Sequence, residues 1–183
     1  MGYTFITHFN AEGYKKLYSY LSVIADETIC RVPYGRGEDK RRYLVDTLPY
    51  HLTVSSSKES LGHLMNLMDG FGFSPFDIMI TGLDIMNGRD GSKVLYYKVV
   101  PSAKMDLLQM KLYGLIGNDK YLPGNNTLHI TICISKDHRK IERIKNNLSK
   151  SFTPFSVKVI SLGLYEIWPG KMMAEYYFSQ AVI

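Results

Sequence analysis

Residues 127–135, TLHITICIS, alternate apolar and polar side chains in the way that is typical of a β-strand. Because a strand has a side-chain period of two, the isoleucines fall on one face, and the other face carries His129, Thr131 and Cys133. A second stretch, LPYHLTVSSSK at residues 48–58, contains the same histidine–threonine pair. The chain therefore has two predicted strands whose polar faces carry the same two side chains.

The two stretches form a short internal repeat that can be counted from His51 and His129. Both copies have threonine two positions after the histidine, serine six after, lysine seven after and an acidic residue eight after. The histidines are 78 residues apart, and each copy leads from a strand toward a helix start. Such a duplicated unit predicts two related lobes whose motif strands meet at a pseudo-twofold axis. Strand–helix junctions favour serine and acidic residues in any case, so an accidental match stays open.

Hydrophobic periodicity and capping residues predict the other elements. Strands are expected at residues 3–9, 50–55, 76–86, 93–100, 127–135, 155–168 and 172–183. Helices are expected after the cap residue Asn10, after a capping box at residues 56–59, at residues 103–116 and within residues 136–150. Their expected buried side chains are Tyr14, Leu17, Tyr18, Leu21 and Ile24, then Leu61, Leu64, Leu67 and Met68, and finally Ile141, Ile144 and Leu148. No linker divides the chain, so we expect one domain over residues 1–183.

The composition is that of a soluble globular protein with a basic surface. Hydrophobic residues make up 45% of the 183 residues, charged residues 21%, and the formal net charge is +5. Residues 31–42 hold five basic and two acidic side chains, and residues 136–150 hold six and two. This distribution favours an anionic partner, although each segment alone is also compatible with a solvated loop or helix face.

Cysteine content and hydropathy indicate the compartment. Cys30 and Cys133 are too few for a disulfide framework and lack the spacing of a metal site, so we expect reduced cysteines in a cytoplasmic protein. No stretch approaches the ~18 apolar residues that span a bilayer. The N-terminus has no charged region followed by a long apolar run, so we expect neither a signal peptide nor a membrane segment.

A histidine and a threonine two residues apart on a strand lie side by side, about 6–7 Å apart along the backbone. Near neutral pH a histidine accepts or donates a proton, and a threonine hydroxyl donates a hydrogen bond to an anionic oxygen. Two such strands would hold a phosphate between two imidazoles. One imidazole would deprotonate the attacking group while the other protonates the leaving oxygen, which cleaves a phosphodiester without a metal.

The motifs HLTV and HITI resemble the paired His-x-Thr/Ser-x motifs of the 2H phosphoesterase superfamily, which includes the bacterial 2′-5′ RNA ligase-like proteins and the cyclic phosphodiesterases. The resemblance extends over nearly the whole chain. It implies an α+β, bilobal fold in which two antiparallel sheets line a central cleft, helices lie outside and the lobes form a pseudo-twofold repeat. It also implies a hydrolase that cleaves 2′,3′-cyclic phosphates or 2′-5′ linkages in RNA ends or oligonucleotides, without a metal or cofactor.

The same resemblance assigns four catalytic positions: His51, Thr53, His129 and Thr131. By analogy with the cyclic phosphodiesterases, His129 would be the base and His51 the acid, but a reversed substrate orientation would exchange these roles. Whether the reaction runs as hydrolysis or as RNA ligation also stays open. As partner we expect a nucleotide or an RNA, bound by a monomeric protein.

Four further residues are candidates for substrate contacts: Tyr34, Arg36, Tyr165 and Trp168. An aromatic ring near the cleft can stack on a base, and an arginine can bind a phosphate. The alternatives are packing of the terminal hairpin for Tyr165 and Trp168, and a solvated loop for Arg36. His8 lies in an apolar frame on the first strand, where a structural role is expected.

Two other hypotheses explain the histidine pairs without catalysis. In the first, the chain is an RNA- or nucleotide-binding module of the same fold, which binds in a salt-sensitive manner without turnover. In the second, the two histidines are satisfied inside a packed sheet, which predicts that both are buried and far apart. A binding module has no evident need for two imidazoles in matched positions, so the enzyme is the favoured interpretation.

Overall fold

The computed structural model describes residues 2–20, 50–88, 91–167 and 170–179. The strands are β1 (Tyr3–Phe9), β2 (Thr53–Ser57), β3 (Phe76–Asn87), β4 (Lys93–Val100), β5 (His129–Ser135), β6 (Phe155–Glu166) and β7 (Met172–Tyr177). The helices are α1 (Ala11–Ser19), α2 (Leu61–Leu67), α3 (Ala103–Ile116) and α4 (His138–Ser149), with a 3₁₀ turn η3 (Asp119–Tyr121). Several residues named in the sequence predictions lie outside the described residues: Leu21, Ile24, Cys30, Tyr34, Arg36 and Trp168.

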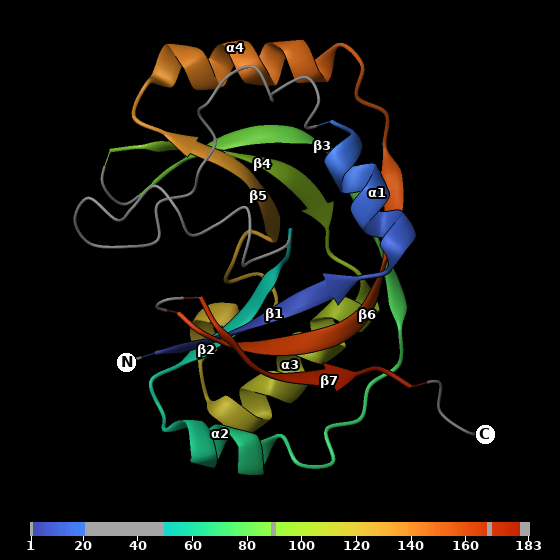
Figure 1. Cartoon of the computed structure of the whole chain (residues 1–183), viewed down its shortest axis with the longest axis vertical. Helices are drawn as coiled ribbons and strands as arrows, with labels where there is room; N and C mark the ends of the chain where they lie inside the picture. Colours follow the sequence, from blue (N-terminus) through green and yellow to red (C-terminus); the bar gives the residue numbers. More distant parts are fainter. Residues whose placement is uncertain (1, 21–49, 89–90, 168–169, 180–183) are drawn as a thin grey trace.

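The described strands form one antiparallel sheet of seven strands in the order β2-β1-β6-β3-β4-β5, with β7 also paired to β6. The expected α+β class is confirmed. The two expected sheets are joined into one continuous sheet by the long strand β3. Residues 76–80 of β3 pair with β6, and residues 79–87 pair with β4. Figure 1 shows the two halves of the sheet one above the other, with α4 above the upper half and α2 and α3 at the lower half.

The two ends of the sheet meet. The strands β2 and β5 are first and last in the pairing order, yet Leu52 and Ile130 form an antiparallel bridge. Both side chains are fully buried, at 0% exposure. The sheet therefore curves until the two motif strands lie next to each other.

The outer face of the sheet packs against the helices. The predicted stripe of Ile141, Ile144 and Leu148 on α4 is buried. Leu17 of α1 is also buried, and its carbonyl accepts a hydrogen bond from the Tyr97 hydroxyl at 3.0 Å. No helix in the described ranges is long and apolar enough to cross a membrane.

Two aspects of the predicted first helix are tested by the structure. Asn10 caps α1 as predicted, since its side chain accepts the N–H of Gly13 at 2.9 Å. Tyr14 is half-buried, whereas Tyr18, which was expected inside, is 40% exposed. Tyr18 packs its ring against Tyr50, with centroids 4.9 Å apart, so an aromatic contact at the surface takes the place of burial.

The predicted start of the second helix is wrong. Residues 56 and 57 continue β2 because they pair with β1, and α2 begins only after Ser60. The Ser60 hydroxyl accepts the N–H of His63 at 3.3 Å and so serves as the cap. On this helix Leu64 and Met68 are buried as expected, while two predicted core residues are only half-buried: Leu61 and Leu67.

Candidate active site at the junction of the two motif strands

The residues of both His-x-Thr pairs line one cavity of ≈ 610 Å³: His51, Thr53, His129 and Thr131. The strand period explains their orientation, because Leu52 and Ile130 point into the core and their neighbours on either side point the opposite way. The two histidines and two threonines of the motifs are all half-buried. The hypothesis of two buried, distant histidines does not fit this arrangement.

The bridge between Leu52 and Ile130 also determines how the motifs face each other. In antiparallel pairing, the residue before one partner lies opposite the residue after the other. His51 therefore lies opposite Thr131, and Thr53 lies opposite His129. An antiparallel pair has a local twofold axis through its centre, and here that axis exchanges the equivalent residues of the internal repeat.

Each motif strand contains a β-bulge at the same position of the repeat. In β2 the pairing with β1 passes from Thr53 to Ser55 and skips Val54. In β5 the pairing with β4 passes from Thr131 to Cys133 and skips the intervening isoleucine. Each skipped residue is the third after its histidine, so the repeat extends to an irregularity of the backbone.

The bulge reverses the alternation of the residues that follow it. Strict alternation predicts Cys133 on the polar face and Ile134 on the core face, but Cys133 is fully buried and Ile134 lines the cavity. The cause is the extra residue Ile132, which shifts the strand period by one. In β2 the same shift buries Ser55 and brings Ser56 to the cavity.

The His129 ring is held by two contacts. Its Nδ1 lies 2.8 Å from the carbonyl oxygen of Thr127, and its ring meets Tyr96 edge-to-face with centroids 5.5 Å apart. A carbonyl oxygen can only accept a hydrogen bond, so Nδ1 carries the proton. The Nε2 atom of the neutral ring then has the lone pair and is able to accept a proton.

The lining of the cavity mixes apolar and polar side chains. Apolar residues come from several strands, among them Met86, Val94 and Ile134. Polar residues include Ser56 from β2 and, from the segment around η3, Lys120 and Asn126. Among the described lining residues Lys120 is the only lysine or arginine. Nothing in the sequence singled out Lys120 and Asn126, because the turn-forming segment 118–126 indicates the end of a helix but not what lies beside it, and Ser56 was expected only as part of a capping box.

Tyr165 is the one predicted substrate-contact residue within the described ranges, and it lines the cavity. It is only 4% exposed. Burial and the negative charge of Glu175 raise the pKa of Tyr165 to about 12. Its hydroxyl is therefore protonated near neutral pH and lies 3.0 Å from His8 Nε2. Nowhere in the described part of the chain do three or more histidine, cysteine, aspartate or glutamate side chains form a group that could hold a metal ion.

Comparison of the sequence with protein families matches residues 42–168 to the 2′-5′ RNA ligase superfamily, a range that covers well over half of the chain. The chain belongs to the 2′-5′ RNA ligase superfamily. The matched range contains both His-x-Thr motifs of this superfamily member, so the resemblance to the 2H phosphoesterases is confirmed. No curated protein sequence gives a significant match.

Solved structures share the fold along nearly the whole length. The protein TT0787 of Thermus thermophilus superposes with a TM-score of 0.58 and 16% identity, covering 97% of both chains. LigT of E. coli, complexed with 3′-AMP, gives 0.54 and 14%, covering 97% of this chain and 98% of its own. Usb1 of Kluyveromyces marxianus gives 0.52 and 10%, covering 96% and 97%. Because the identities are this low, the similarity to these structures establishes the fold of this chain but not its activity.

Proposed function

We propose that the protein is a metal-independent phosphodiesterase that cleaves a nucleotide phosphodiester by two-histidine general acid–base catalysis. The expected bonds are 2′,3′-cyclic phosphates or 2′-5′ linkages in RNA ends or short oligonucleotides. The observation that carries the proposal is that both His-x-Thr pairs line one cavity at the junction of β2 and β5. Two proton carriers and two neutral hydroxyl donors are suited to displacement at phosphorus.

The hydrogen bond of His129 supports its role as the base. With the proton held on Nδ1 by the Thr127 carbonyl, Nε2 takes a proton from water as the water oxygen bonds to phosphorus. His51 donates a proton to the ribose oxygen that leaves, so one P–O bond forms and one breaks. Thr53 and Thr131 donate hydrogen bonds to the non-bridging oxygens, where negative charge increases in the transition state.

Cavity size and the superfamily relatives support a nucleotide substrate. The volume of ≈ 610 Å³ lies within the ~300–1,000 Å³ that is typical of small-ligand sites. E. coli LigT has been solved in complexes with 3′-AMP, with NADP⁺ and with phosphate, and K. marxianus Usb1 with uridine monophosphate. In this chain Lys120 would contribute a positive charge beside the bound phosphate.

RNA ligation is a second candidate function, because the superfamily is named after 2′-5′ RNA ligases and ligation is the reverse direction of the same chemistry. Hydrolysis and ligation pass through related transition states, so the same two histidines would exchange the roles of acid and base. A ligase would join an RNA with a 2′,3′-cyclic phosphate end to one with a 5′-hydroxyl end.

A substrate panel tests the proposal. The panel contains 2′,3′-cyclic mononucleotides, an RNA with a cyclic phosphate end, 2′-5′ oligoadenylate and cyclic dinucleotides, and the position of the product phosphate is determined. A parallel reaction with a 5′-hydroxyl RNA detects ligation. EDTA should leave the rates unchanged.

Variants of the two histidines test the mechanism. His51→Ala and His129→Ala should each lower the rate by about 10²–10⁴-fold, the usual contribution of a general acid or base. His63→Ala removes an exposed histidine of α2 and should leave the rate unchanged. Full activity in both site variants would refute the proposal. Salt-sensitive binding without turnover by the wild type would indicate the non-catalytic module instead.

A further inference from the structure

Three pairs of equivalent repeat positions line the cavity: His51 with His129, Thr53 with Thr131, and Ser56 with Ile134. The first two pairs are identical, and the local twofold axis at the bridge exchanges their members. The four motif side chains by themselves therefore accept a phosphodiester in two equivalent orientations. The third pair breaks this symmetry, because it has a hydroxyl in one half of the sheet and an apolar side chain in the other.

The apolar member of this pair belongs to a row of three apolar side chains. Ile134 of β5 pairs with Val94 of β4, and Val94 pairs with Met86 of β3. All three line the cavity, and the residues that neighbour the row on the opposite face, Leu95 and Cys133, are fully buried. Val94 is itself buried, but Met86 and Ile134 are half-buried. These three residues, which we call the apolar row, therefore present apolar surface to the cavity.

The equivalent row in the other half of the sheet consists of hydroxyl-bearing residues. Ser56 of β2 pairs with Thr4 of β1, Thr4 pairs with Tyr165 of β6, and all three line the cavity. The Asn118 side-chain amide donates to Ser56 Oγ at 3.2 Å and to the Ser56 carbonyl oxygen at 2.7 Å. Because Ser56 Oγ accepts this bond, its own proton can be donated to a ligand. We call these three residues the hydroxyl row.

The strand register determines which histidine lies nearer to each row. Along β5, the apolar row comes next to Thr131, which lies opposite His51. Along β2, Ser56 of the hydroxyl row comes next to Thr53, which lies opposite His129. His51 is therefore the histidine nearer to the apolar row, and His129 is the histidine nearer to the hydroxyl row.

A nucleotide has the same asymmetry as the cavity, since a base with apolar faces lies on one side of its phosphate. Proteins that take up a single base pack its faces against aromatic or apolar side chains. We propose that the apolar row binds the base of the substrate and thereby fixes its orientation. The ribose oxygen that leaves is then beside His51, and the attacking water is beside His129 at the hydroxyl row. This inference rests on the proposed nucleotide substrate and deepens it, because it assigns the base-binding residues.

Nuclear Overhauser effects in a complex with a nucleoside 3′-monophosphate test the inference without turnover. In wild-type protein with labelled methyl groups, the base protons should give cross-peaks to the methyl groups of Met86, Val94 or Ile134. Cross-peaks to the methyl group of Thr4 in place of these would mean the reverse orientation and would overturn the inference. A bound nucleotide without any cross-peak to the apolar row would overturn it as well.

Binding to variants provides a second test, in which the nucleoside 3′-monophosphate and inorganic phosphate are titrated separately. Ile134→Ser and Met86→Ser should each weaken nucleotide binding at least tenfold, because a methylene group in an apolar pocket contributes about tenfold or more. Binding of inorganic phosphate should not change. Ile134→Leu conserves volume and should stay within about twofold of the wild type. Met79→Ser removes an exposed methionine of β3 outside the lining and should change neither affinity.

The outcomes separate this inference from the proposed catalysis. Equal losses of nucleotide and phosphate affinity in Ile134→Ser and Met86→Ser would show that the apolar row is merely structural and would overturn the inference. A larger loss of nucleotide affinity in Ser56→Ala than in Ile134→Ser would also overturn it. Thermal unfolding reports the folding of each variant, and the wild-type cross-peaks decide the case even if a variant fails to fold. If the base lies on the apolar row but the nucleotide ester is never cleaved, the catalysis fails while the inference stands.

Discussion

At the scale of single residues, the two members of each motif have different tasks. In the proposed mechanism the histidines move protons, and the proton on His129 Nδ1 is located by the carbonyl oxygen of Thr127. The threonines would supply hydrogen-bond donors that carry no charge. Valine nearly matches threonine in shape, so the hydroxyl contribution can be isolated by substitution.

Thr53→Val and Thr131→Val should each lower kcat by about 10²-fold, because a hydrogen-bond donor aimed at developing negative charge acts mainly in the transition state. KM should change little. Steady-state kinetics check this, with Thr153→Val at an exposed position as the control. An increase of KM at constant kcat would mean that the hydroxyls bind the ground state equally well.

Glu175 should make stability depend on pH. Burial raises its pKa, but hydrogen bonds from Ser161, His8 and Tyr177 outweigh burial and hold the pKa below its ordinary 4.5. The folded state then binds this proton more weakly than the unfolded chain does. The stabilisation is therefore present above the unfolded-state pKa and is lost as the pH falls through the folded-state pKa.

Glu175→Gln should accordingly flatten the decrease in the free energy of unfolding between about pH 5 and pH 3. Urea unfolding at a series of pH values measures this slope. Glu142→Gln, on the exposed face of α4, controls for the loss of a carboxylate. If the free energy of unfolding depends on pH in the same way in the wild type and in Glu175→Gln, the pKa of Glu175 is not lowered in the folded state.

At the scale of elements, sequence patterns predicted the helices and strands that are determined by contacts between residues close in sequence. The helix expected at residues 103–116 is α3 (Ala103–Ile116), because its cap and its apolar spacing lie within the helix itself. The bulges at Val54 and Ile132 were missed, since a bulge exists only in relation to a partner strand. Ser56 matches a capping pattern, yet its backbone pairs with Thr4, and strand pairing prevails.

Two glycines of α3 should respond to alanine in opposite directions. Gly117 ends the helix at φ 72°, where an L-residue is strained, so Gly117→Ala should cost about 1 kcal/mol of unfolding free energy. Gly114 lies within the helix with nothing within 4 Å of an added Cβ, so Gly114→Ala should gain about 0.5–1 kcal/mol. Urea unfolding measures both values, and the same sign in both would contradict this account of the helix end.

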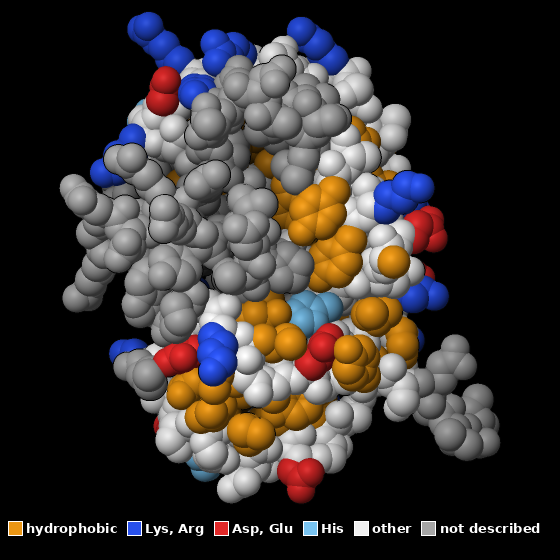
Figure 2. Space-filling view, in the orientation of Figure 1, with side chains coloured by type: hydrophobic (Ala, Val, Ile, Leu, Met, Phe, Trp, Pro, Cys, Tyr) orange, Lys and Arg blue, Asp and Glu red, His pale blue; other side chains and the backbone are white. Residues whose placement is uncertain are grey.

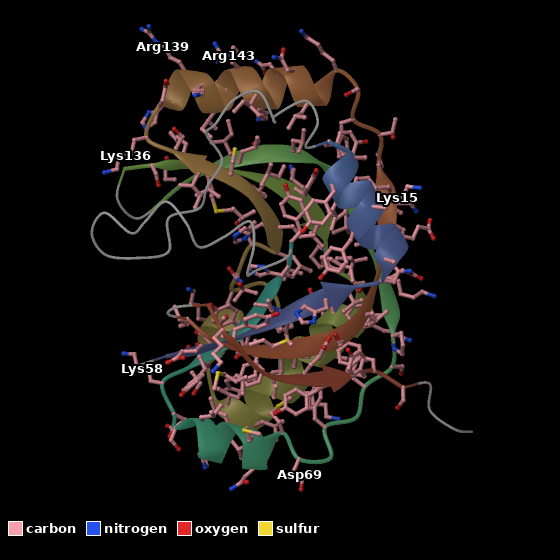
Figure 3. All side chains as sticks on the ribbon, in the orientation of Figure 1. Lys15, Lys58, Asp69, Lys136, Arg139 and Arg143 are labelled. Atoms are coloured by element: carbon pink, nitrogen blue, oxygen red, sulfur yellow. The ribbon has the colours of Figure 1, made fainter. Side chains whose placement is uncertain are left out.

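At the scale of the whole molecule, the closure of the sheet determines which residues share the site. The repeat predicted that the two motifs meet, and they line one cavity. Lys120 and Asn126 also line it, and they lie only nine and three positions before His129, but they could not be predicted because nothing in the pattern of that turn-forming segment indicates what it packs beside. Lysine and arginine side chains gather elsewhere, over α4 at one end of the molecule, and Arg139 and Arg143 point away from the sheet (Figures 2 and 3).

This distribution of charge predicts that two positively charged side chains contribute differently to KM when each is replaced. Lys120→Gln should raise KM for a nucleotide substrate roughly tenfold and weaken its dependence on salt, since the proposed charged hydrogen bond from Lys120 to the substrate phosphate would be lost. Arg139→Gln removes an equal charge from the exposed face of α4 and should leave KM for a small nucleotide unchanged. Measurement of KM at several salt concentrations distinguishes the two variants, and equal effects would mean that net charge alone matters.

The bridge between Leu52 and Ile130 has a consequence for folding kinetics. The histidines sit on the first and last strands of the pairing order, so the cavity exists only after β1, β6, β3 and β4 have paired between them. Contacts between residues so distant in sequence form late, because their loop-closure entropy must be overcome first. Turnover in the proposed reaction would therefore report completion of the entire sheet during refolding, and a fragment that contains only one of the two motif strands would be inactive however well it folds.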